Sequence, residues 1–282
     1  MDKKPDFIIA GAGRSGTTTL FHLLKQHPDI CMPRKELSFF RDWYDQGIDA
    51  YLQFFQACPP GTVIGDGSQN EMIGPRSPQR MQALRPDLKL IFILRDPVDR
   101  MYSDYKRRVQ KRGLSRDFLT LIREEPRLIE KSLYHKHLSR YLAFFPWEQI
   151  QVLFFEAFAA NSDPVLRKCC AFLGVDPDFQ RVVPPSGTNA SGMPWSRELQ
   201  RWLHRCTEQD RPVYRRSLEP ALKRTFLDAL GKYGGRLNQL GGGRRFPPLP
   251  ARTRTRLLDT YFREDILALE ALLGTDLSSW KQ

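Results

Sequence analysis

The residues best suited to chemistry form a glycine-rich stretch near the beginning of the chain. An apolar run, residues 7–10, leads into Gly-Ala-Gly-Arg-Ser-Gly-Thr-Thr at positions 11–18. Glycines let the backbone curl closely around a ligand because they lack a Cβ. The N–H groups that open a following helix, the hydroxyls and the guanidinium would then all face an anion. The residues predicted to bind this phosphate-like group are Gly13, Arg14, Ser15, Gly16, Thr17 and Thr18.

The same loop departs from two nucleotide-binding patterns. The glycine spacing of residues 11–16 fits the dinucleotide fingerprint, which also needs a buried strand ending in an acid about twenty residues later. Residues 27–33 are too short and too closely bounded by prolines to be that central strand. The P-loop of kinases places a lysine where Thr17 stands. A P-loop nucleotide kinase is therefore the alternative enzyme class, and it is disfavoured.

A second element lies about eighty residues further along the chain. Residues 88–94 form an apolar, strand-like run that ends at Arg95. Asp96 is a good helix N-cap and Pro97 suits the first helical position, so a helix with Ser103 in its second turn is expected. Open α/β sheets bind ligands at the carboxyl ends of their strands. Arg95 is therefore predicted to face the same ligand as the glycine-rich loop.

Together the two elements resemble the sulfotransferases that use 3′-phosphoadenosine 5′-phosphosulfate (PAPS). The resemblance is tight over the first hundred residues and loose from there to about residue 280. It implies that residues 13–18 hold the 5′-phosphosulfate and that Arg95 and Ser103 bind the 3′-phosphate. It also implies that adenosine 3′,5′-bisphosphate (PAP) is the product and that no metal is needed.

A third element, residues 33–40, resembles the Lys-Glu-x-x-Phe-Phe segment of heparan-sulfate-type and related bacterial sulfotransferases. The resemblance implies that Glu36 is the catalytic base and that Lys35 approaches the phosphosulfate. An acceptor hydroxyl must lose its proton as it attacks sulfur, and a nearby carboxylate can take that proton. The apolar neighbours of Glu36 are predicted to desolvate it partly. Arg14 and Lys35 are expected to neutralise the charge that grows on the leaving group.

Three further positions follow from the resemblance. His137 stands where a helix histidine assists catalysis in the heparan N-sulfotransferase branch, so it competes with Glu36 as the base. Gly67 replaces the lysine of the Glu-Lys-Ser/Thr segment of the heparan enzymes, which argues against heparan as the acceptor. Arg244 and Arg245 belong to a basic, glycine-containing loop that is expected to close over PAPS.

The elements that must position these residues predict an α/β fold with a P-loop-like parallel sheet flanked by helices. We expect one sulfotransferase domain over residues 1–282, with a PAPS-binding core at 1–180 and C-terminal helices and a cofactor-covering loop at 181–282. Strand-like apolar runs alternate with helical stretches near residues 6–10, 63–65, 88–94 and 149–155.

Composition limits partners and location. The 282-residue chain has a formal net charge of +12, which attracts anions. It shows no zinc-finger, RNA-binding or basic-zipper signature, so no nucleic-acid partner is expected. Its apolar segments fall short of the roughly 18 residues that span a bilayer. No membrane span, signal core or Golgi anchor is expected, and the predicted location is cytoplasmic.

The five cysteines are predicted to be reduced thiols, as in the cytosol. No C-x-x-C pair occurs, so neither a metal site nor a disulfide framework is expected. The cysteines are Cys31, Cys58, Cys169, Cys170 and Cys206.

The function predicted from the sequence is transfer of the sulfuryl group of PAPS to a hydroxyl or amine. The acceptor is a saccharide or a small molecule, and the sequence does not decide between them. A non-catalytic protein that binds nucleotides or polyanions remains the alternative outside enzymes. Oligomeric state is not predicted.

Overall fold

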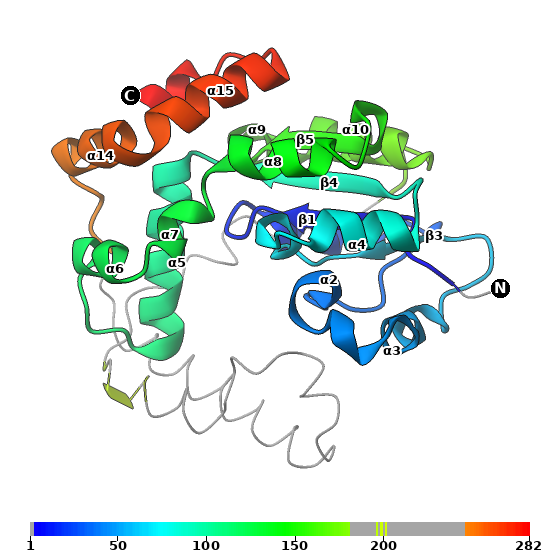
Figure 1. Ribbon diagram of the computed structural model, residues 1–282. Coiled ribbons are helices and arrows are strands. Elements are labelled where there is room, and N and C mark those ends of the chain that lie inside the picture. Colours follow the sequence, from blue (N-terminus) through cyan, green and yellow to red (C-terminus); the bar gives the residue numbers. More distant parts are fainter. Residues whose placement is uncertain (1–2, 181–195, 197, 200, 202–245) are drawn as a thin grey trace. The chain divides into compact units, whose positions relative to one another are not determined.

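The computed structural model describes residues 3–180, 196, 198–199, 201 and 246–282 (Figure 1). In this part of the chain five parallel strands form one sheet, in the order β2-β3-β1-β4-β5. The predicted α/β fold with a parallel sheet is therefore confirmed. The strands are β1 (Phe7–Gly11), β2 (Ile30–Cys31), β3 (Val63–Asp66), β4 (Lys89–Leu94) and β5 (Ile150–Phe154).

Helices lie in the connections between the strands, as expected for parallel strands, which need crossover connections. Up to the end of β5 they are α1 (Thr17–Leu24), α2 (Phe39–Asp42), α3 (Ile48–Leu52), α4 (Ser77–Leu84), α5 (Pro97–Arg112), α6 (Phe118–Glu124), α7 (Arg127–Glu130) and α8 (Tyr134–Leu142). After β5 come α9 (Phe155–Ala160), α10 (Ser162–Leu173), α14 (Ala251–Leu257) and α15 (Arg263–Leu273). None of the described helices is long and apolar enough to cross a membrane.

The chain divides into two compact units. The first comprises residues 1–100, 131–183 and 262–282, and it holds the whole sheet. The second comprises residues 101–130 and 184–261. Helix α5 begins in the first unit and continues into the second.

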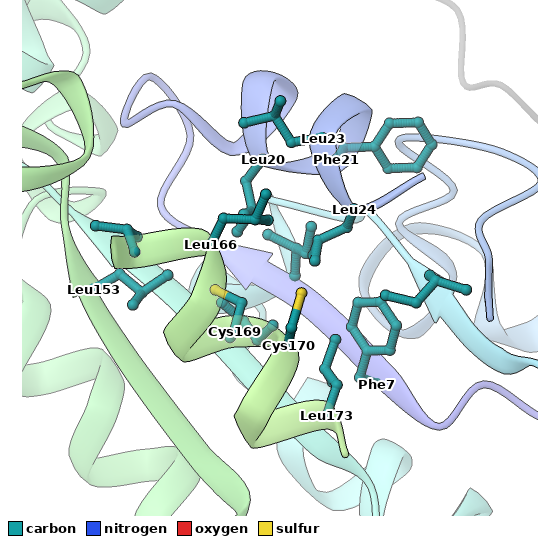
Figure 2. Close-up of a cluster of buried hydrophobic side chains, with 14 of the residues drawn as sticks. Phe7, Leu20, Phe21, Leu23, Leu24, Leu153, Leu166, Cys169, Cys170 and Leu173 are labelled. Atoms are coloured by element: carbon teal, nitrogen blue, oxygen red, sulfur yellow. The ribbon is translucent and has the colours of Figure 1, made fainter. Parts of the chain in front are cut away.

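The sheet is buried on both faces, which explains why its central strands are apolar throughout. On one face, Ile91 and Ile93 of β4 belong to a core cluster with α1 and α10 (Figure 2). On the other face, the ring of Phe92 packs against Tyr141 of α8, with the ring centroids 4.9 Å apart. All residues of β1 are buried. The loops at the strand ends therefore start from rigid positions.

The structure contradicts the predicted reduced state for one pair of cysteines and agrees with it for another pair. Cys31, at the end of β2, forms a disulfide with Cys58, with the two Cα atoms 5.7 Å apart. The predicted reduced state is therefore wrong for this pair, which short-range spacing could not reveal because 27 positions separate the two cysteines. Cys169 and Cys170 are free thiols in the α10 core (Figure 2). Cys206 lies outside the described residues.

The short strand β2 agrees with the sequence analysis. It has two residues and lies at the edge of the sheet beside β3, so residues 27–33 supply no central strand. The dinucleotide fingerprint therefore lacks the second buried strand that it requires.

Candidate active site

The glycine-rich loop joins the end of β1 to the start of α1. Arg14 and Gly16 have φ angles of 75° and 90°, in the left-handed region that non-glycine residues seldom adopt. Gly16 caps α1 without a side-chain hydrogen bond, and the first turn of α1 contains no acidic residue. The helix therefore presents its N-terminal N–H groups and the positive end of its dipole without a capping side chain or an acidic residue in its own first turn. This geometry suits an anion.

The hydroxyls of the loop have different surroundings. Ser15 is fully buried, and its Oγ has no hydrogen-bond partner among the described residues. A buried hydroxyl without a partner is unfavourable, and an oxyanion held in the loop would supply one. The Thr17 hydroxyl instead donates to Gln69 Oε1 at 2.6 Å. Thr18, the next residue of α1, is half-buried.

Arg95 connects the second sequence element to this loop. It follows β4 directly, and its Nη1 donates to the carbonyl oxygen of Arg14 at 3.3 Å. Its guanidinium lies 4.5 Å from the ring centroid of Phe155, a cation–π contact that restrains it. Two elements 81 positions apart in the sequence thus meet at one edge of the sheet.

The helix after Arg95 begins as predicted. Pro97 is the first residue of α5, and the Asp99 N–H donates to the Asp96 carboxylate at 2.9 Å. Ser103 is buried on α5, in the second unit, and its pairing with Arg95 on a 3′-phosphate stays a prediction. Arg244 and Arg245 lie outside the described residues.

Glu36 is held by two donors on a strained backbone. Glu36 and Ser38 have φ angles of 62° and 51°, and left-handed non-glycine residues often mark functional sites. Lys35 Nζ and Gln69 Nε2 both donate to Glu36 Oε1, at 2.7 Å and 2.9 Å. The Glu36 side chain is 42% exposed, and these two side chains are polar rather than the apolar neighbours that the sequence suggested.

The segment that carries Glu36 is fixed to the end of β3. Alternate backbone N–H groups of residues 36–40 donate to residues 67–71, so the strand end sets the position of the segment. The bonds run from Glu36 N to Gly67 O at 3.0 Å, from Ser38 N to Ser68 Oγ at 2.9 Å and from Phe40 N to Glu71 Oε1 at 3.0 Å. On its other side the segment is anchored by Phe39, whose ring stacks on Tyr51 at 4.5 Å.

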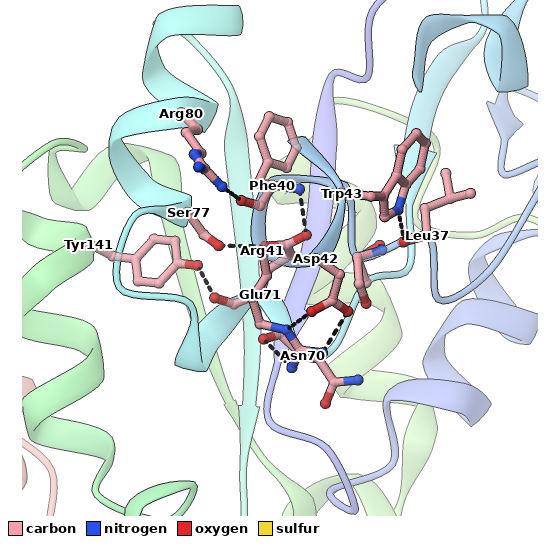
Figure 3. A network of polar contacts seen from close by, with 12 residues as sticks. Leu37, Phe40, Arg41, Asp42, Trp43, Asn70, Glu71, Ser77, Arg80 and Tyr141 are labelled. Atoms are coloured by element: carbon pink, nitrogen blue, oxygen red, sulfur yellow. Dashed lines mark hydrogen bonds and ion pairs between the residues drawn. The ribbon is translucent and has the colours of Figure 1, made fainter. Parts of the chain in front are cut away.

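Two buried carboxylates support this segment. Glu71 accepts directly from Phe40 N (Figure 3), and Asp66 accepts from Ser68 Oγ, which in turn accepts from Ser38 N. Ser77 Oγ donates to Glu71 Oε2 at 2.5 Å, and the Tyr141 hydroxyl donates to the Glu71 carbonyl at 2.7 Å. Burial raises the pKa of Glu71 to about 8, against the opposing hydrogen bond from Ser77. Asp66 accepts from Tyr51 at 2.8 Å, and burial raises its pKa to about 6.

These raised pKa values predict a pH-dependent stability. Unfolded Glu71 loses its proton near 4.5, whereas the folded protein keeps that proton up to about pH 8. Between these pH values the folded state binds more protons, so stability falls as the pH rises. Glu71→Gln keeps the shape of the side chain but cannot titrate. We expect its free energy of unfolding, measured by urea unfolding, to fall less than that of the native chain between pH 4.5 and about pH 8.

Asp66→Asn is the matched control. Folded Asp66 loses its proton near pH 6, so its effect on the pH dependence of stability ends near that pH. A difference between the native chain and Glu71→Gln that stayed constant from pH 5 to pH 8 would contradict the raised pKa of Glu71.

His137, the competing base, has a different environment from Glu36. Its side chain is fully buried on α8, and Arg140 donates to its Nδ1. A base must come within hydrogen-bond reach of the acceptor proton, which the partly exposed Glu36 meets more readily. The variants Glu36→Gln and His137→Asn distinguish the two residues.

Gly67 has no room for the lysine of the heparan enzymes. A Cβ added there would lie 2.5 Å from Phe21 Cδ2, so Phe21 would have to move. Lys35 is a cation that contacts Glu36. The packing of Phe21 therefore favours glycine over lysine at position 67.

Sequence reasoning missed Gln69 and Glu71, which both contact the segment that carries Glu36. A signal was present, because Gly67 marks this stretch of the sequence and both residues lie within four positions of it. The described residues contain no group of three or more histidine, cysteine, aspartate or glutamate side chains arranged to hold a metal ion.

The chain is similar to known sulfotransferases. The chain is 29% identical to the human bifunctional heparan sulfate N-deacetylase/N-sulfotransferase 3, over 99% of this chain and 31% of that protein. It is 33% identical to the mouse heparan sulfate glucosamine 3-O-sulfotransferase 3B1, over 61% of this chain and 46% of that protein. The chain thus spans less than half the length of these relatives.

A bacterial structure matches nearly the whole chain. The crystal structure of a sulfotransferase from Alicyclobacillus acidocaldarius superposes with a TM-score of 0.73 and 26% identity, over 99% of this chain and all of that chain. Residues 4–207 match the family model of the sulfotransferase domain. With this match over most of its length, the chain belongs to the family of PAPS-dependent sulfotransferases.

Proposed function

We propose that the protein transfers the sulfuryl group of PAPS to a hydroxyl or amine of a saccharide or small-molecule acceptor, with Glu36 as general base. The observation that carries this proposal is the connection between base and anion loop, because Gln69 contacts both Glu36 and Thr17. The partnerless buried hydroxyl of Ser15 and the contact of Arg95 with the loop support PAPS as the donor.

In this reaction the acceptor oxygen or nitrogen attacks sulfur and loses its proton to the Glu36 carboxylate. The bond between sulfur and the bridging oxygen breaks, and PAP leaves with the electron pair. Negative charge grows on that bridging oxygen. The guanidinium of Arg14, the ammonium of Lys35 and the N–H groups at the start of α1 are charged or polar donors suited to stabilise it. Positioning and electrostatics then carry the step, as in phosphoryl transfer.

The acceptor class rests on the relatives and on Gly67. The named relatives include an N-sulfotransferase and a 3-O-sulfotransferase of heparan sulfate, so both nitrogen and oxygen acceptors suit this family. The filled space beside Gly67 excludes the lysine expected in the heparan enzymes unless Phe21 moves. We therefore propose an acceptor other than heparan sulfate. Assays with labelled PAPS against pools of saccharides and small hydroxylated or amino compounds test this directly.

PAP is expected to raise the melting temperature, and adenosine 5′-monophosphate to raise it far less. Arg95 and Ser103 would contribute to binding only when a 3′-phosphate is present. At a ligand concentration one hundred times Kd, binding stabilises the folded state by about 2.7 kcal/mol, which is a shift of several degrees for a chain of this size. Thermal-shift assays with both nucleotides measure the difference.

Equal shifts from the two nucleotides would contradict the assignment of Arg95 and Ser103. Strict dependence of turnover on magnesium would instead favour the kinase alternative. A shift specific for PAP without transfer to any acceptor would indicate a binding protein.

A further inference from the structure

The side-chain amide of Gln69 spans the proposed base and the glycine-rich loop. Its Nε2 donates to Glu36 Oε1 at 2.9 Å, and its Oε1 accepts from Thr17 Oγ1 at 2.6 Å. We propose that Gln69 is a positioning residue that fixes the Glu36 carboxylate against the loop. This inference rests on the proposed function and names a residue to which the family resemblance assigned no role.

The direction of this hydrogen-bond chain follows from the groups themselves. An ionised carboxylate only accepts hydrogen bonds, so the NH₂ side of the Gln69 amide must face Glu36. The amide oxygen then faces Thr17, whose hydroxyl must donate. The chain therefore runs in one direction, from the first residue of α1 to the base. Movement of Thr17 in the loop is therefore coupled to the carboxylate through this amide.

The contact can be removed without removing the supports of the backbone. Glu36 N and Ser38 N are bonded to Gly67 O and Ser68 Oγ, and neither bond involves the side chain of Gln69. That side chain is half-buried. A substitution at Gln69 is therefore expected to alter the orientation of the Glu36 side chain while the segment stays in place.

The chemical character of the amide also matters for the base. Lys35 supplies one charged donor to Glu36 Oε1, and Gln69 supplies a second that is neutral. A neutral donor orients a carboxylate while suppressing its basicity less than a second cation would. With no room for a lysine side chain at Gly67, Gln69 serves as this second donor.

Gln69→Met tests the proposal because it keeps the chain length and removes both hydrogen bonds. We expect kcat to fall about tenfold while KM for PAPS changes little, since a hydrogen bond to a charged group is worth at least a factor of about ten. In the plot of kcat against pH, the rise on the acid side (the acid limb) should move up by about one pH unit. The reason is that the carboxylate loses a donor that favours its charged form. A purely structural role would not move that limb.

Two further variants sharpen the comparison. Gln79→Met makes the same chemical change at an exposed position of α4 and should leave kcat and the acid limb as in the native protein. Gln69→Glu places a second carboxylate beside Glu36 and should move the acid limb further up than Gln69→Met does. Melting temperatures of all variants report whether each is folded.

The outcomes separate this inference from the proposed function. If the native protein turns over and Gln69→Met keeps both its kcat and its acid limb, the positioning role is wrong. If the native protein transfers sulfuryl to no acceptor, the proposed function fails, but the contact can still be measured. NMR of the ¹³C-labelled glutamate carboxyls, with Glu36→Gln for assignment, gives the titration midpoint of Glu36. This midpoint should rise in Gln69→Met, and an unchanged midpoint would overturn the inference.

Discussion

Glu36→Gln is expected to lower kcat by about 10²- to 10⁴-fold, the usual range for loss of a general base. Glutamine keeps the shape of the side chain and its contact with Lys35 but cannot take a proton. Affinity for PAP and the melting temperature should therefore stay close to those of the native protein. Steady-state kinetics at saturating PAPS and acceptor, with calorimetry for PAP, measure these quantities separately.

The controls for this prediction come from the same chain. Glu148→Gln makes the same change at an exposed residue and should have no effect on kcat. His137→Asn tests the competing base, with the melting temperature recorded because His137 is fully buried. A Glu36→Gln variant that turned over normally beside a folded but inactive His137→Asn variant would show that Glu36 is not the base.

Arg95→Ala is expected to raise the Kd for PAP by about 10- to 100-fold, as expected for the loss of hydrogen bonds to a charged group. A phosphate that does not change during the reaction contributes equally to ground-state and transition-state binding. The value of kcat at saturating PAPS should therefore change much less than Kd. Arg14→Ala should show the opposite pattern, with its larger effect on kcat. Titration calorimetry and initial rates distinguish the two.

Arg76→Ala, at an exposed position before α4, is the matched control and should change neither quantity. Arg95→Lys keeps the charge but not the planar fork, and it should recover only part of the affinity. An Arg95→Ala variant with the native Kd for PAP would place the 3′-phosphate elsewhere. An Arg14→Ala variant with the native kcat would remove Arg14 from the transition state.

Local sequence determined the parts of this protein whose chemistry lies within a few residues of one another. Glycine spacing after an apolar run predicted the loop at residues 11–16, because only a few residue types allow such a turn. Apolar continuity at residues 88–94, followed by Asp96 and Pro97, predicted β4 and the start of α5. These patterns act within one strand end or one helix turn, so no distant contact is needed to specify them.

The tertiary structure decided what depends on residues far apart in the chain. It paired Cys31 with Cys58, and it buried His137. It also brought Gln69 to Glu36 across 33 positions and to Thr17 across 52. A glutamine or a glutamate in a loop has no periodicity or spacing that marks it. Its role arises only when parallel strands bring their carboxyl ends to one edge of the sheet, where side chains from separate segments come within hydrogen-bond distance.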